Sequence, residues 1–169
     1  LYRWQKGRFT QLTKGPWVVT QLVGVDQKRG RVYFLGNKDD VLEQQLYAVD
    51  IAKPGQVTRL TERGWWNKDA VMDDAATRVI VTRSNPNQPP QTYLADADGL
   101  RQTWVSENRV VPGHPWYPFA AAARQEEFGT LKAADGQELH WRMVKPAMQP
   151  GKRYPVFFQH YGGPHSQYV

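Results

Sequence analysis

The 169-residue chain contains no cysteine, which excludes disulfides, a thiolate nucleophile and cysteine-ligated zinc. It also lacks any apolar run near the roughly 18 residues that a membrane-spanning helix needs, so we predict no membrane span in this segment. There is no initiator Met and no secretory signal at the start. We therefore expect Leu1 to be an internal position of a longer protein.

The chain also lacks the G-x-S-x-G motif that exposes a serine nucleophile between a strand and a helix. Its only serines are Ser84, Ser106 and Ser166, and none has the two flanking glycines. Ser84 lies in a turn-forming stretch and Ser106 lies at a predicted strand edge. Ser166 follows a glycine pair, where we expect it to bond local backbone. No nucleophile is predicted within the chain.

The four histidines do not show the spacing of a metal site. They are His114, His140, His160 and His165. A zinc site built from His160, His165 and a carboxylate would lack the ligand spacing of known zinc sites. We predict no metal and no cofactor.

Positive charge is in excess, but it is not organised for nucleic acid. The formal charge is +6 and the sequence pI is about 9.6. The lysines and arginines are scattered singly or in pairs, without the basic helix, RNP-like strand or Cys/His finger of a nucleic-acid-binding module. We interpret them as a solvated surface and expect no nucleic-acid partner.

What the chain does contain is a repeat. A tyrosine-bearing strand occurs three times, around Tyr2, Tyr47 and Tyr93, at spacings of 45 and 46 residues. A turn follows each strand, and then a second strand ends in a Thr- or Trp-rich edge. These second strands are Thr10–Thr13, Thr58–Thr61 and Gln102–Val105.

Two further strands lie between successive pairs. They are predicted at Gln21–Val25 and Arg31–Leu35, and again at Ala70–Met72 and Arg78–Thr82. Four short strands in about 40–45 residues are typical of a β-propeller blade. Residues 1–109 are thus predicted to form a partial propeller of about two and a half blades. A plain β-sandwich with coincidental spacing is the alternative.

The pattern changes near residue 110, where a Pro/Gly-rich linker begins. A short helix is predicted at Phe119–Arg124, followed by a hairpin of Glu127–Lys132 and Glu138–Val144 around an Asp-Gly turn. The apolar run Tyr154–His160 has the character of a strand buried in a mixed α/β sheet. We predict that residues 110–169 form this linker and the N-terminal part of an α/β-hydrolase domain, so that the chain is mainly β with a truncated second domain.

The end of the chain is the most specific stretch. The apolar strand runs into Tyr161-Gly162-Gly163-Pro164-His165-Ser166-Gln167. Together with the blades, the Asp-Gly hairpin, the stretch at Leu12–Val19 and the strand at Leu46–Ile51, this order resembles the dipeptidyl peptidase IV branch of the prolyl oligopeptidase family. The resemblance covers the whole chain.

The resemblance implies a catalytic role for Tyr161, whose phenolic O–H would be one donor of an oxyanion hole. Gly162 and Gly163 permit a sharp reversal close to the substrate, and Pro164 stiffens the turn. An aromatic residue at the end of a core strand, bonded to backbone, is the alternative. The family places its nucleophile, Asp and His downstream of this loop, so His160 and His165 are not expected to act as the base.

The implied activity is that of a serine exopeptidase releasing N-terminal dipeptides with Pro or Ala second, through an acyl-enzyme. The partner is then a peptide with a free N-terminus, and the parent protein a homodimer. We expect a bacterial periplasm as its compartment. Two alternatives are another peptidase of this fold, such as an oligopeptidase or acylaminoacyl peptidase, and a non-catalytic propeller scaffold.

The propeller stretch itself offers few candidate site residues. Asp39, Asp40 and Glu43 lie between two predicted strands, where we expect a solvated turn. The pairs Trp65-Trp66 and Trp116-Tyr117 are expected to pack between blades or domains, with a ligand platform as the alternative.

Overall fold

The computed structural model describes residues 1–123 and 126–160 of the chain. Over these residues the backbone is mainly β-structure with one short helix, which confirms the prediction of a mainly β chain. The chain divides into two compact units, Leu1–Tyr117 and Pro118–Val169.

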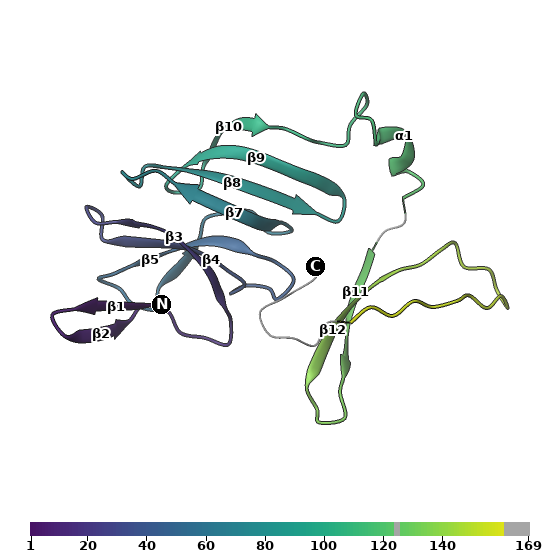
Figure 1. The fold of residues 1–169 in the computed structure, drawn as a ribbon, viewed down its shortest axis with the longest axis horizontal. Coiled ribbons are helices and arrows are strands. Elements are labelled where there is room, and N and C mark those ends of the chain that lie inside the picture. The colour runs from purple at the N-terminus through teal and green to yellow at the C-terminus, as the bar shows by residue number, and fades with distance from the viewer. Residues whose placement is uncertain (124–125, 161–169) are drawn as a thin grey trace. The chain divides into compact units, whose positions relative to one another are not determined.

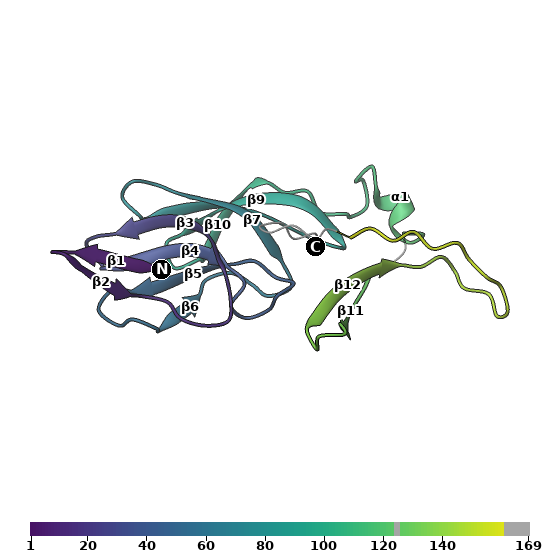
Figure 2. The same cartoon turned by 60° about the horizontal axis from the view of Figure 1, so that its bottom comes forward.

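The first unit contains a hairpin and two four-stranded antiparallel sheets (Figure 1). The hairpin strands are β1 (Tyr2–Gln5) and β2 (Arg8–Gln11). The first sheet has β3 (Val19–Asp26), β4 (Arg31–Gly36), β5 (Gln45–Asp50) and β6 (Val57–Arg59). The second has β7 (Trp66–Met72), β8 (Arg78–Asn85), β9 (Gln88–Asp96) and β10 (Arg101–Ser106). Figure 2 shows β6 at the edge of the first sheet, beside β5.

Both sheets pair their strands in sequence order, so each is a meander of one chain segment. Tyr47 and Tyr93 occupy the third strand of their sheets, and Tyr2 lies on the first strand of the hairpin. The hairpin therefore corresponds to the third and fourth strands of a sheet. The repeat seen in the sequence is confirmed as two complete four-stranded units and half of another.

The two sheets of this unit bury their facing sides against each other. Alternate residues of a strand point to opposite faces, so one strand serves two interfaces. One face of the first sheet packs against the second sheet, and the buried residues there are Leu35, Leu46, Ala70, Val79, Val81, Tyr93 and Ala95. Its other face carries the buried residues Val32, Phe34, Tyr47 and Val49, against which Leu1 and Leu12 pack. The first sheet is thus apolar on both of its faces.

Two of the three predicted outer strands end earlier in the structure than the sequence predicts. Thr58–Thr61 was expected as a strand, whereas β6 ends at Arg59. The regular pairing with β5 stops here because the Leu46 N–H donates to the side-chain oxygen Thr61 Oγ1, at 3.0 Å, and not to a backbone carbonyl. The strand expected at Thr10–Thr13 is likewise displaced to β2, which ends at Gln11.

The second unit is built around one hairpin, which confirms the Asp-Gly prediction. Its strands are β11 (Glu126–Lys132) and β12 (Glu138–Val144), and Gly136 takes a left-handed φ of 86° in the turn. The helix α1 (Tyr117–Ala120) begins two residues before the predicted start. Ala123 N–H still donates to the Phe119 carbonyl at 3.0 Å, so one further turn follows.

The strand predicted at Tyr154–His160 is wrong, because residues 152–160 form no regular structure. Phe157 and Phe158 are 96% and 90% exposed. An apolar segment becomes a central strand only where neighbouring strands and helices cover it, and no strand of the described residues pairs with this segment.

In the part of the chain that the structure describes, no helix has the length and apolar character to cross a membrane.

Candidate functional site

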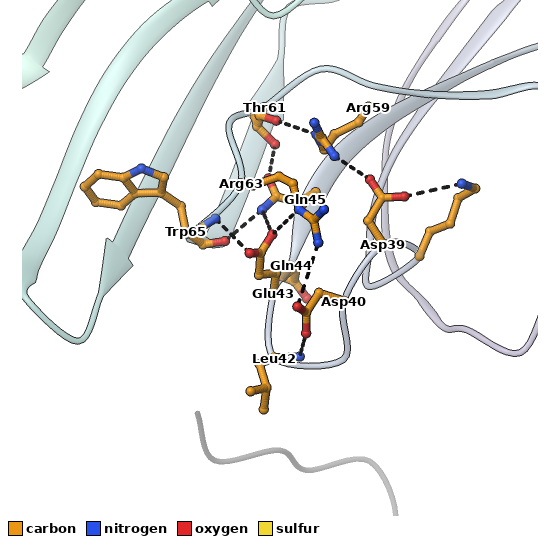
Figure 3. Close-up of polar contacts among 12 residues, drawn as sticks. Asp39, Asp40, Leu42, Glu43, Gln44, Gln45, Arg59, Thr61, Arg63 and Trp65 are labelled. Carbon is orange, nitrogen blue, oxygen red and sulfur yellow. Dashed lines mark hydrogen bonds and ion pairs between the residues drawn. The ribbon is translucent and has the colours of Figure 1, made fainter. Parts of the chain in front are cut away.

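The predicted oxyanion loop, Tyr161 with Gly162, Gly163 and Pro164, lies outside the described residues. Its role stays a prediction. Within the described residues, the densest group of charged side chains lies at the end of the first sheet where β4 leads into β5. We call it the Glu43 cluster, and its members are Asp39, Asp40, Glu43, Arg59 and Arg63 (Figure 3).

Glu43 is the centre of this cluster and is held by several donors. Its Oε1 accepts from the Gly64 N–H at 2.8 Å, and its Oε2 accepts from Gln45 Nε2 at 2.8 Å. Arg63 Nε lies 3.9 Å from Oε2. The side chain is only 14% exposed, so the expected solvated turn is wrong at this position. The carboxylate instead serves as an acceptor that fixes the loop before β7.

Asp39 is paired with two cations at the rim of the cluster. Arg59 Nη1 donates to it at 2.8 Å, and Lys38 Nζ donates at 3.3 Å. Burial would raise the pKa of Asp39, but the hydrogen bonds from Arg59 and Lys38 outweigh burial and hold the pKa below the ordinary 3.8. The carboxylate is therefore ionised throughout the neutral range.

This pairing predicts a pH-dependent contribution to stability. A lowered pKa in the folded state contributes stability above the unfolded pKa, and that stability is lost as the pH falls through the folded value. We expect Asp39→Asn to lower the free energy of unfolding by on the order of 1 kcal/mol at pH 7. The deficit should shrink below about pH 4, where the wild-type carboxylate also becomes neutral.

Urea denaturation at a series of pH values measures this difference. Asp40→Asn is the matched control, because Asp40 approaches Arg63 only at 3.9 Å and should contribute less. A deficit for Asp39→Asn that stays constant from pH 7 to pH 3 would contradict the ion-pair account.

Beneath the charged rim lies a buried amide network that joins the two sheets. Asn67 Nδ2 donates to the Gln44 carbonyl at 2.6 Å and to Gln45 Oε1 at 3.0 Å. Thr61 Oγ1 donates to the same Gln45 oxygen at 2.5 Å, and Gln45 Nε2 also reaches the Trp65 carbonyl at 3.0 Å. Buried polar groups are costly unless paired, and every polar atom named here has a partner, so the network holds the start of β7 against the start of β5.

One further residue of this region, Arg83, was not predicted from the sequence. Its guanidinium stacks on Trp65 at 4.0 Å from the ring centroid and pairs with Glu62 at 2.8 Å. The side chain is 9% exposed. The signal was present in the sequence, because Arg83 follows Val79 and Val81 in the inward-facing phase of β8. Trp65 was predicted to pack between blades or domains, whereas this stack joins it to β8 of the same sheet that it leads into.

Ser84, Ser106 and His140, none of which is predicted to act in catalysis, each lie on a strand. Ser84 lies on β8 opposite Trp66, and Ser106 ends β10. His140 lies on β12 with its Nε2 3.9 Å from Glu138. Among residues 1–123 and 126–160, no group of three His, Cys, Asp or Glu side chains has the arrangement to hold a metal ion.

The Glu43 cluster is therefore a structural element. Its three carboxylates are matched by Arg59, Arg63 and the neighbouring Lys38, so the charges compensate one another. Oppositely charged groups that already pair leave little field for a ligand. The cluster holds the loops at one end of the two sheets in a fixed arrangement.

The sequence of this chain is similar to those of several known proteins. The family model for the dipeptidyl peptidase IV (DPP IV) N-terminal region matches residues 1–90. Dipeptidyl peptidase 8 of Homo sapiens is 31% identical over 170 residues, covering 94% of this chain and 18% of the relative. Dipeptidyl peptidase 4 of Arthroderma otae is 27% identical and covers 100% of this chain and 22% of the relative.

A solved structure shows the same architecture. The crystal structure of Porphyromonas gingivalis dipeptidyl peptidase 4 matches with a TM-score of 0.75 and 26% identity, covering 89% of this chain and 21% of that one. The chain spans about a fifth of the length of these relatives. Since the family model matches residues 1–90, more than half of the 169, the chain belongs to the family of the dipeptidyl peptidase IV N-terminal region.

Proposed function

We propose that the full-length protein containing this chain is a serine-type dipeptidyl peptidase. It removes dipeptides from peptides with a free N-terminus, with Pro or Ala in the second position, through an acyl-enzyme. The observation that carries the proposal is the match of nearly the whole chain to proteins named dipeptidyl peptidase from animals and fungi.

Within this proposal Tyr161 is the one catalytic residue that the chain supplies. Charge develops on the carbonyl oxygen as the tetrahedral intermediate forms, and a positioned O–H donor stabilises it. Gly162 and Gly163 leave room for the substrate backbone, and Pro164 stiffens the turn. The match to the Arthroderma otae relative extends over 100% of this chain and so takes in these four residues.

The division of labour along the chain is part of the same proposal. Residues 1–109 belong to the propeller, which restricts access to the active site, and residues 110–169 are the linker and the start of the catalytic domain. The nucleophile, its Asp and its His come from elsewhere in the full-length protein, which we propose to be a homodimer. No cofactor takes part.

We expect the purified 169-residue chain to be inactive. No serine in it has the flanking glycines of a nucleophile elbow, so it has no group to form the acyl-enzyme. The measurement is turnover of an X-Pro chromogenic substrate, with the full-length protein as the positive control. Turnover by the isolated chain above background would contradict this assignment.

The activity itself is tested with the full-length protein and a serine-reactive phosphonate that carries an X-Pro dipeptide. We expect stoichiometric labelling and loss of X-Pro hydrolysis in parallel. Hydrolysis that survives complete exposure to the phosphonate would rule out the serine mechanism.

A further inference from the structure

The segment that follows β10 continues that strand in register after the backbone ladder has ended. The last pair of the ladder is Ser106 of β10 with Thr92 of β9. The same register, extended by two residues, places Asn108 opposite Pro90, and Asn108 Nδ2 donates to the Pro90 carbonyl at 3.3 Å. A side-chain amide thus takes the position of a backbone donor.

The proline explains why the ladder stops. In an antiparallel pair, two opposite residues can exchange two N–H···O bonds, and the N–H and C=O of one residue point to the same side of its strand. The Pro90 carbonyl faces the segment after β10, but Pro90 has no N–H to donate beside it. The regular exchange cannot form at this position, so the pairing beyond it depends on side chains.

A second side chain holds the segment two residues further on. The register places Val110 opposite Gln88, and the Val110 N–H donates to Gln88 Oε1 at 3.2 Å. Gln91 Nε2 donates to the same oxygen at 3.4 Å and so orients the Gln88 amide. The backbone of the segment is therefore fixed to β9 by the side chain of a β9 residue.

Residues 107–110 thus form a strap along the second sheet. Asn108 and Val110 are half-buried while Glu107 and Arg109 are exposed, which is the alternation of a strand. The strap is held by one side-chain bond at each of its two pairs. One net hydrogen bond changes an equilibrium by about fivefold, so the strap is attached more weakly than the regular strands before it.

We propose that this strap is a detachable part of the connection between the two units. The second unit begins at Pro118, and with the strap attached the free connection starts after Val110. Detachment adds residues 107–110 to that connection, and four extended residues span up to about 13 Å. The strap therefore sets how far the connection reaches, and the Gln88 side chain controls how often the strap is released.

Residue-resolved amide hydrogen exchange on the full-length protein tests the strap with two substitutions of Gln88. Gln88→Met keeps the length of the side chain but has no amide oxygen, so we expect the protection factor of the Val110 amide to fall roughly fivefold or more. Gln88→Glu keeps an acceptor oxygen for the Val110 N–H and should keep the protection. The Val81 amide, in the middle of the same sheet, is the internal reference and should not change. Asn108 is left unchanged because its Oδ1 also contacts His114 Nε2 at 2.9 Å.

Limited digestion with trypsin shows whether the strap detaches as a unit. Cleavage after Arg109 needs the surrounding backbone to be released, and its rate follows the population of the open state when opening and closing are fast. We expect Gln88→Met to raise the rate of cleavage between Arg109 and Val110 by about the factor by which the Val110 protection falls. Gln88→Glu should leave the rate unchanged.

Unchanged Val110 protection in Gln88→Met, or an equal fall in Gln88→Glu, would overturn the proposal. So would a parallel fall at Val81, because the substitution would then act on the whole sheet. A cleavage rate that stays constant while the Val110 protection falls would show that the strap does not detach. None of these readouts uses catalysis, so the outcome is independent of the proposed peptidase activity.

Discussion

Tyr161→Phe is expected to lower kcat of the full-length protein by about two to three orders of magnitude on an X-Pro chromogenic substrate. Removal of one oxyanion donor costs transition-state stabilisation of that size. The phenolic O–H would act mainly on the oxyanion of the transition state, so KM should change much less than kcat. Steady-state kinetics over a range of substrate concentrations separates the two constants.

Tyr154→Phe is the matched control for this experiment. It removes the same hydroxyl seven residues earlier, where Tyr154 Oη accepts from the Gln149 N–H at 3.1 Å in an exposed turn. We expect kcat within about twofold of wild type, since the contact is exposed and local. A normal kcat for Tyr161→Phe, or an equal loss in both variants, would refute the oxyanion role.

Gly99→Ala is expected to destabilise the fold by about 3 kcal/mol or more. Gly99 lies in the turn between β9 and β10 with a φ of 87°, and a Cβ there would meet the Leu60 carbonyl oxygen at 2.1 Å. Leu60 follows β6 of the neighbouring sheet, so neither backbone can move without disturbing the packing between the sheets. Urea denaturation followed by far-UV circular dichroism measures the change.

Gly55→Ala separates the two contributions to that loss. Gly55 has a φ of 85°, nearly the same as Gly99, but a Cβ there would meet nothing within 4 Å. Its substitution should cost only the left-handed backbone conformation, about 1 kcal/mol. Similar losses in both variants would show that the close approach to Leu60 does not constrain the sheets.

The repeat made most of the first unit predictable. Regularly spaced tyrosine strands and turn residues mark local, short-range pairings, and the structure forms them as meanders. The Asp-Gly turn located the hairpin of the second unit for the same reason. Both signals depend on neighbours in sequence.

Contacts between distant residues were not predictable in this way. Glu43 is in a sequence typical of a solvated loop. In the structure, however, its two carboxylate oxygens accept hydrogen bonds from the Gly64 N–H and from Gln45 Nε2. The inward-facing position of Arg83 on β8 could be read from the sequence, but its partners Trp65 and Glu62 reach it from the loop before β7. Sequence alone does not reveal which partners will compensate a charge.

The segment Tyr154–His160 was predicted to be a buried strand and is not one. Its apolar run has the composition of a buried strand, but composition does not supply the neighbouring strands that would bury it. Among the described residues these side chains remain largely exposed. The prediction of Tyr161 rests on the family resemblance and on the order of residues after this segment.

The proposed dipeptidyl peptidase activity is tested most directly by mass spectrometry. The full-length protein is given a peptide that begins with Ala-Pro, and the products that it releases are identified. We predict the free dipeptide Ala-Pro from the unblocked peptide and no cleavage of the same peptide with an acetylated N-terminus. Cleavage of the acetylated peptide, or release of fragments other than the N-terminal dipeptide, would contradict the assignment as a dipeptidyl peptidase.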